Sequence, residues 1–346
     1  SEEPVPQDGN RPVAPSDYDR KMHELTHIPH ADWCPHCIAG RGRADAHKSG
    51  NNEERTNAVV QFDYCFATSE MTLVEDEEQA RVKILVAKDM DSGYPFATVV
   101  LKKGSNDMYA VEVMARWIDQ LGLTDAYFQS DGEAAIKDLV RAVARRCSTL
   151  RVRFRVAPKG SPSSNGGAEG TVKLIMSTVR VFISALKEQC GVQISPGDPL
   201  LVWMIRHAAW CEARYRASGA HKQSPYFRIH GRNYANPTCM IGEIVMARIP
   251  DPKEIGKLQP RFLRGVFLGK SDTSDSYIVA CSDGVVRVTR VIRRKPAGSE
   301  FCAKDLQEMR ALPWALKDDG ERPQLEDVRA LPALPGETEQ NHFFYH

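Results

Sequence analysis

Long hydrophobic runs are missing from this sequence of 346 residues. No apolar stretch approaches the roughly 18 residues that a membrane-spanning helix needs, so we expect no membrane partner. Net charge is also nearly absent, because 46 Lys and Arg stand against 45 Asp and Glu. The balance of +1 gives no bulk indication of an acidic or a basic partner. The sequence has no signal peptide and starts at Ser rather than Met, so we expect a piece of a longer polyprotein.

Paired cysteines are lacking as well. The nine cysteines are an odd number and are scattered along the chain, except for Cys34 and Cys37. This usage argues against a disulfide framework and for a reducing compartment. The length allows two or three domains with a sizeable core.

Shifts in composition divide the chain into five parts. We expect a polar, Pro-rich and disordered leader (1–20), a His- and Cys-rich segment (21–48), an α/β core (55–235), a run of short strands (240–298) and an acidic, Pro-rich tail (299–346). The tail is expected to be disordered or to tether the next polyprotein segment.

Hydrophobic periodicity predicts the order βββαβαβα in the core. The predicted strands include NAVVQFDYCF (57–66), RVKILVA (81–87), FATVVL (96–101), DAYFQS and RVRFRV, and long helices are predicted near 106–121, 168–190 and 199–217. The first three strands are expected to form an antiparallel meander. This order favours a mixed sheet with helices on its faces.

Three acids stand out within these elements. Asp63 lies in the middle of the first strand, Asp131 ends the fourth strand, and Glu169 opens the long helix. Taken singly, each acid could be a cap, a turn residue or a surface carboxylate. Since the first and fourth strands are expected to be neighbours, the three together predict an oxygen-ligand site for Mg²⁺ or Mn²⁺.

The segment KGSPSSNGGAEG (159–170) contains Glu169, the last of these acids. Its glycines permit flexing and close approach to nucleic acid. Asn165 and Ser164 are predicted to cap the helix that follows. Glu169 lies in the first helical turn, where the helix dipole favours a negative charge.

Basic residues continue from the same helix. Lys173, Arg180 and Lys187 fall within about 40° of Glu169 on the helical wheel, and predict a track for a DNA backbone. The alternative is a solvated helix face. A second basic run contains no acid: Arg141, Arg145, Arg146, Arg151, Arg153, Arg155 and Lys159. We interpret it as a phosphate-binding face, although charges that protect an edge strand explain part of it.

The N-terminal cluster has the spacing His23-x3-His27-x6-Cys34-x2-Cys37. Two His on one helix face and a Cys-x2-Cys turn predict a closed tetrahedral Zn²⁺ site, which would fold a segment too small to hold a core. Other histidines are available as substitutes, but are better explained as surface residues: His30, His36 and His47.

The pattern of Asp63, Asp131-Gly132 and Ser161-Pro-x-Ser-Asn-Gly-x-Ala-Glu169 resembles the D,D,E catalytic core of integrases of retroviruses and LTR retrotransposons, most closely the copia type. Its second and third acids lie 38 positions apart. The resemblance implies an RNase H-like fold, an HHCC-type zinc module before it and an SH3-like DNA-binding barrel after it. The segment HKQSPYFRIHG (221–231) resembles the one that follows such cores.

This resemblance implies a DDE polynucleotidyl transferase and endonuclease. Two metal ions held by Asp63, Asp131 and Glu169 would support 3′-end processing and strand transfer, which joins element DNA to target DNA. The predicted DNA contacts are Lys159, Asn165, Lys173, Arg180, Arg151 and Arg153. A homo-oligomer, a nuclear location and an optional host tethering factor are also implied.

Three alternatives remain open at the level of sequence. One is another DDE transposase or nuclease on the same fold, against which the flanking modules argue. Another is an inactive or domesticated integrase that only binds DNA, against which the intact acid triad argues. The last is a zinc-dependent interaction module without catalysis, for which the α/β core would be surplus.

Overall fold

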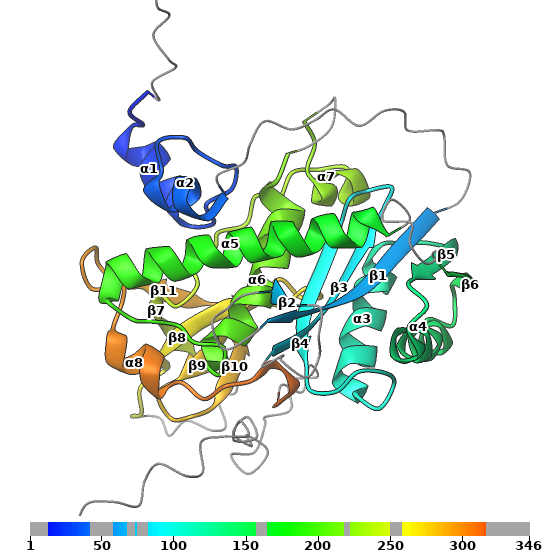
Figure 1. Ribbon diagram of the computed structural model, residues 1–346. Coiled ribbons are helices and arrows are strands. Elements are labelled where there is room, and N and C mark those ends of the chain that lie inside the picture. Colours follow the sequence, from blue (N-terminus) through cyan, green and yellow to red (C-terminus); the bar gives the residue numbers. More distant parts are fainter. Residues whose placement is uncertain are drawn as a thin grey trace, which may run out of the picture.

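The computed structural model describes residues 13–41, 58–67, 73–74, 82–156, 165–217, 222–249 and 258–315 (Figure 1). Its helices are α1 (Asp17–Glu24), α2 (Pro35–Arg41), α3 (Met108–Gln120), α4 (Ala134–Arg146), α5 (Gly166–Cys190), α6 (Pro199–Tyr215), α7 (Pro225–His230), α8 (Ala303–Glu308) and the 3₁₀ turn η3 (Pro313–Ala315). Its strands are β1 (Ala58–Ala67), β2 (Leu73–Val74), β3 (Val82–Asp89), β4 (Pro95–Val100), β5 (Asp125–Ser130), β6 (Arg151–Val156), β7 (Ile244–Arg248), β8 (Phe262–Lys270), β9 (Tyr277–Cys281), β10 (Val286–Thr289) and β11 (Ile292–Arg294).

The predicted mixed sheet is confirmed. Its strand order is β4-β3-β1-β5-β6, and the short β2 pairs with β1. β1, β3 and β4 are antiparallel, as the sequence predicts, whereas β1, β5 and β6 run parallel. Parallel neighbours need a crossover, which α3 supplies before β5 and α4 supplies before β6.

Alternation along the strands divides the core between two faces of this sheet. On β3, Ile84 and Val86 pack in the cluster that contains α5 and α6, whereas Leu85 and Ala87 pack with α3 and α4. Both faces are therefore covered, which explains the nearly continuous apolar sequence of this strand. Figure 1 shows α5 as one long helix that passes from the α1–α2 unit to the sheet.

The second sheet is antiparallel throughout, in the order β10-β9-β8-β7-β11. Four strands form a meander, and β11 returns to pair with β7. One face of this sheet carries a small apolar cluster around Phe267 and Val279. This sheet accounts for the short strands predicted after residue 240, while the closure of a barrel stays a prediction.

Two expectations about disorder are wrong for the described residues. The leader predicted over 1–20 already contains the start of α1, because Ser16 caps that helix by accepting a 3.1 Å hydrogen bond from the Asp19 N–H. The tail predicted from residue 299 is ordered as far as 315. Leu306 and Leu312 are each 1% exposed, and the Ala311 carbonyl accepts a 2.9 Å hydrogen bond from Trp203 Nε1. Apolar burial therefore outweighs the polar composition of this segment.

Among the described helices, none combines the length and the apolar character that crossing a bilayer requires.

Candidate functional site

Two of the three predicted acids lie at adjacent parallel strands: Asp63 is on β1, and Asp131 directly follows the last residue of β5. The register pairs Gln61 of β1 with Gln129 of β5. Asp63 and Asp131 each follow two residues later, so Asp63 lies next to the point where β5 ends and Asp131 begins the turn into α4. The structure thus brings together the two aspartates that the sequence predicts to be neighbours.

The Asp131 carboxylate is held by the turn into α4. Its Oδ1 accepts a 3.1 Å hydrogen bond from the Glu133 N–H, an interaction typical of Asp at a turn. Glu133 forms an ion pair with Lys103. This acid is a neighbour of the site that the sequence analysis did not single out.

Burial and like charge raise the pKa of Asp63 to about 7. Burial is the larger cause, because it disfavours the ionised carboxylate. The carboxylates of Asp131, Glu169 and Glu133 add repulsion in the same direction. The three predicted acids therefore interact electrostatically, although their carboxylate oxygens do not all lie within 4.8 Å of one another.

The start of α5 is fixed by β1. Gln61 Oε1 accepts hydrogen bonds from the N–H groups of Gly167 (2.9 Å) and Ala168 (3.2 Å), and Asn165 Nδ2 donates to the Phe62 carbonyl at 3.2 Å. A side chain at Gly167 would overlap Gln61 and the Met90 sulfur. Glycine therefore permits the close approach of α5 to β1, which fixes the helical turn that contains Glu169.

The predicted cap is partly wrong. Asn165 occupies the N-cap position, but its side chain makes no capping hydrogen bond and is 7% exposed. The buried Gln61 on β1 satisfies the first free N–H groups of the helix instead. Ser164, the other predicted cap, lies outside the described residues. The sequence signal for Gln61 is a polar residue in an apolar strand, two positions before the acid.

The predicted DNA contacts on α5 have different surroundings. Lys173 is exposed, one helical turn beyond Glu169. Arg180 instead donates hydrogen bonds to the Gly40 carbonyl from Nε at 3.3 Å and from a terminal nitrogen at 3.2 Å. Arg180 thus connects α5 to the N-terminal unit.

The basic edge strand β6 also differs from its expectation. Arg153 forms an ion pair at 2.6 Å with Asp125 on β5, and donates a 2.9 Å hydrogen bond to the Tyr127 hydroxyl. The acid missing from the local sequence is thus supplied by the neighbouring strand. Arg151 is exposed, whereas Lys159 lies outside the described residues. The role in DNA binding stays a prediction for all the predicted DNA contacts, including Asn165.

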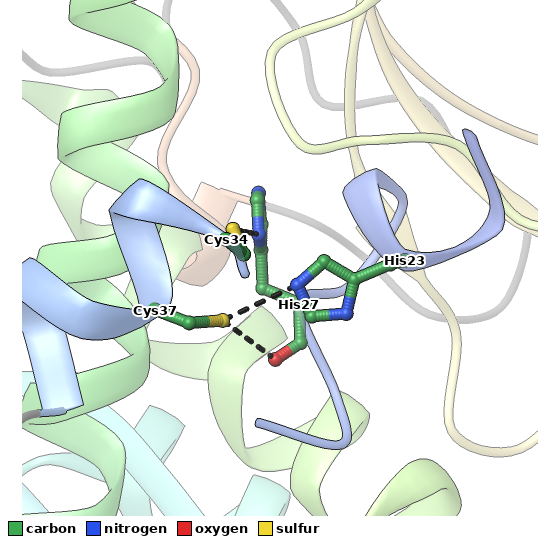
Figure 2. Close-up of side chains that lie close together, drawn as sticks. All are labelled: His23, His27, Cys34 and Cys37. Atoms are coloured by element: carbon green, nitrogen blue, oxygen red, sulfur yellow. Dashed lines mark hydrogen bonds between the residues drawn. The ribbon is translucent and has the colours of Figure 1, made fainter. Parts of the chain in front are cut away.

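The predicted His₂Cys₂ cluster is confirmed. One ligand atom from each of His23, His27, Cys34 and Cys37 lies within 4.8 Å of every other, and all four residues are buried. Figure 2 shows the Cys37 sulfur facing His23 Nε2 at 3.3 Å and the Cys34 sulfur facing His27 Nδ1 at 3.5 Å. Elsewhere in the described ranges, no comparable group of three or more His, Cys, Asp or Glu side chains is gathered around a shared point.

This donor set fits zinc. Tetrahedral bonds of about 2.3 Å to sulfur and 2.0 Å to nitrogen place neighbouring ligand atoms about 3.5 Å apart, as seen here. Contact with Cys37 is the main cause that lowers the pKa of Cys34, and burial lowers the pKa of His27. Thiolate and neutral imidazole are the forms that bind zinc. His27 Nε2 is buried without a partner among the described residues.

The N-terminal unit, which comprises α1, α2 and the His₂Cys₂ cluster, packs against α5. His36 Nδ1 lies 2.8 Å from Ser184 Oγ, and His36 Nε2 lies 3.1 Å from Glu188. Gly40 packs so closely on Val181 that an added Cβ would approach Val181 Cγ2 to 2.5 Å. The interpretation of His36 as a surface histidine in a mobile loop is therefore wrong, because its ring is held against the core.

Comparison with known proteins finds similarity between this chain and solved structures. No protein-family model and no curated protein matches this chain. Solved structures similar to it include retroviral integrases. A chain of the simian T-cell lymphotropic virus intasome, determined in complex with PP2A regulatory subunit B56 gamma, is 16% identical, with a TM-score of 0.39 over 76% of this chain and 88% of that chain.

Two catalytic core domains are also similar. The BIV integrase core is 15% identical, with a TM-score of 0.33 over 49% of this chain and 92% of that chain. The HTLV-2 integrase core, determined with magnesium in a trimeric form, is 14% identical, with a TM-score of 0.33 over 50% of this chain and 96% of that chain.

Proposed function

We propose that this protein is a retrotransposon integrase, which trims element DNA ends and joins them to target DNA. The observation that carries the proposal is the arrangement of the acids: Asp63 lies on β1, Asp131 directly follows the neighbouring β5, and Gln61 ties the first turn of α5, which contains Glu169, to β1. A folded chain that desolvates one carboxylate beside two others stores a repulsion that a divalent cation relieves. Acids whose pKa is shifted by burial and by neighbouring charges are typical of catalytic sites.

Asp63, Asp131 and Glu169 would hold Mg²⁺ or Mn²⁺, an assignment that the all-oxygen donor set fits. When bound, the metal supplies charge stabilisation for phosphoryl transfer and activates the attacking oxygen. The chain's own contribution is placement. β1 and β5 fix the two aspartates, the Glu133 N–H orients Asp131, and Gln61 sets where Glu169 enters. No covalent protein intermediate is required.

The remaining assignments complete this proposal. Residues 21–48 would be a zinc module, 55–235 an RNase H-like catalytic core and 240–298 an SH3-like barrel for DNA. Exposed Lys173 and Arg151 would contact phosphates, which form the sequence-independent part of DNA recognition. Two DNA ends must be held together, so we propose a homo-oligomer acting in the nucleus, with a host tethering factor as an optional partner.

The test is Mg²⁺-dependent joining of a duplex oligonucleotide to supercoiled plasmid. Glu169→Gln keeps the size of the side chain but removes its charge, and should abolish joining. Glu133→Gln is the matched control, because Glu133 is also an acid near Asp63 but is paired with Lys103. We expect Glu133→Gln to retain most of the activity. Wild-type joining by Glu169→Gln would refute the assigned triad, and DNA binding without any joining by wild type would favour an inactive DNA-binding protein.

A further inference from the structure

A cavity unrelated to the three acids lies at the opposite edge of the core sheet. β4, α3, α6 and the turn between β8 and β9 enclose an inner chamber of about 40 Å³. It adjoins an outer chamber of about 530 Å³, which reaches α7 and residues 230–236. The two chambers share Arg116, Gln120 and Arg214 in their walls, so a single ligand could extend through both.

Four of the side chains that line the inner chamber carry an N–H group without a hydrogen-bond acceptor in the described part of the chain. Trp117 Nε1, Trp210 Nε1, Arg214 Nε and Gln120 Nε2 are buried and have no acceptor among the described residues. Trp117, Trp210 and Arg214 are only 5%, 4% and 6% exposed. An unpaired buried polar group costs about 1–3 kcal/mol, so four around one cavity call for an acceptor-rich occupant.

The charges that line the inner chamber also favour a ligand that accepts hydrogen bonds. Arg116, Arg206 and Arg214 line it, whereas its acidic residue is Asp272, at 3.5 Å from Arg206 and 3.7 Å from Arg214. Glu112, outside the lining, lies 3.4 Å from Arg116. Cations outnumber acids in the lining, so a negatively charged group that accepts hydrogen bonds suits the chamber.

The outer chamber offers aromatic faces. Arg214 lies 4.3 Å from the ring centroid of Trp210 and 5.4 Å from those of Tyr226 and Tyr234. The Tyr226 and His230 rings are 4.2 Å apart. Aromatic side chains next to arginine are surfaces on which nucleobases stack. Asp275 at this wall is already paired with Lys270 at 2.9 Å.

We propose that this cavity binds a nucleoside phosphate. The phosphate meets the unpaired donors and arginines of the inner chamber, and the base stacks in the outer chamber on Tyr226 or Tyr234. The source is either a free nucleotide or one nucleotide of a single strand, since both carry this chemistry. The site does not depend on the proposed function, because none of its lining residues belongs to the acid triad.

The indole N–H groups allow a direct test by ¹H–¹⁵N NMR on the full chain with zinc retained. AMP, GMP, CMP and dTMP are titrated separately, alongside inorganic phosphate and a short single-stranded oligonucleotide. We expect saturable shifts of the Trp117 and Trp210 indole signals, assigned with Trp→Phe variants. Trp203 is the internal control, because its indole N–H already donates to Ala311 and should not respond.

Substitutions of single residues test whether the nucleotide binds in this cavity. Gln120→Leu removes one unpaired donor at similar size and should weaken nucleotide binding about tenfold, as expected for one hydrogen bond to a charged group. The same change at exposed Gln189 on α5 is the matched control and should have no effect. Glu169→Gln should leave the shifts unchanged, which separates this site from the catalytic one.

The ligands distinguish the outcomes. Shifts with mononucleotides support a free-nucleotide site, and shifts with the oligonucleotide alone support a strand-binding site. Equal shifts with inorganic phosphate overturn the nucleoside part of the proposal, because the cavity would then take an anion only. Absence of indole shifts with every ligand, or equal binding by Gln120→Leu and wild type, overturns the proposal.

Discussion

Replacing Asp63 by asparagine should make the protein more stable at pH 8 in the absence of divalent cations. The pKa of this carboxyl is raised from 3.8 to about 7 by burial and by the neighbouring acids. The folded state therefore binds the proton more tightly than the unfolded state, so wild-type stability falls as pH rises from about 4 through 7. The Asp63→Asn substitution keeps the shape of the side chain and removes its charge.

The expected size of the stability difference follows from the shift in the pKa of Asp63. About three pKa units at 1.36 kcal/mol each give a penalty of about 4 kcal/mol above pH 7, and almost none below pH 4. The difference in unfolding free energy between Asp63→Asn and wild type should thus grow with pH and level off above pH 7. Urea unfolding at a series of pH values measures it, with zinc retained and Mg²⁺ omitted. Adding Mg²⁺ at pH 8 should stabilise wild type more than the variant.

A second aspartate supplies a control of opposite sign. Hydrogen bonds from Ser105 lower the pKa of Asp138, which is exposed on α4. Its folded pKa lies below the unfolded value, so Asp138→Asn should lose stability at neutral pH rather than gain it. A stability difference for Asp63→Asn that does not change with pH, or a loss at pH 8, would refute the burial of Asp63 beside other negative charges.

Three further outcomes follow from the same geometry. Lys173→Ala should weaken DNA binding and reduce the salt slope of log K by about one if it contacts one phosphate, measured across a salt series; an unchanged slope removes Lys173 from the interface. A Cys34→Ser/Cys37→Ser variant should lose stoichiometric zinc by metal analysis, and retention of one ion per chain would contradict the ligand set. Gly167→Ala should lower Mg²⁺-dependent joining at least tenfold by displacing Glu169, and activity equal to wild type would show that the overlap with Gln61 is relieved without moving the helix.

Local patterns predicted the parts of the fold that depend on neighbours in sequence. Alternation in β3 and helical spacing in α3 identify buried faces directly, and the zinc ligands lie within fifteen residues of one another. That the strand carrying Asp63 and the strand preceding Asp131 are neighbours also followed from the predicted order of elements.

Contacts between distant segments could not be predicted in the same way. Gln61 caps a helix more than 100 residues later, and His36 contacts Ser184. A buried Gln in a strand and a His beside a zinc ligand have several explanations until the partner is known. The ordering of 299–315 was missed because its apolar residues are sparse, although those few reach the core.

The helix α5 contacts both of the proposed metal sites, but the two are held independently. Glu169 is placed by the first turn of α5, which Gln61 and Asn165 fix to β1. The N-terminal unit contacts the helix farther along, from Ser177 to Glu188. At 1.5 Å per residue the nearer of these contacts lies about 12 Å from Glu169, and buried apolar residues hold the intervening turns against the core. Loss of zinc should therefore release the N-terminal unit without moving the acid, so the module's contribution would lie in holding DNA or a second copy rather than in the chemical step.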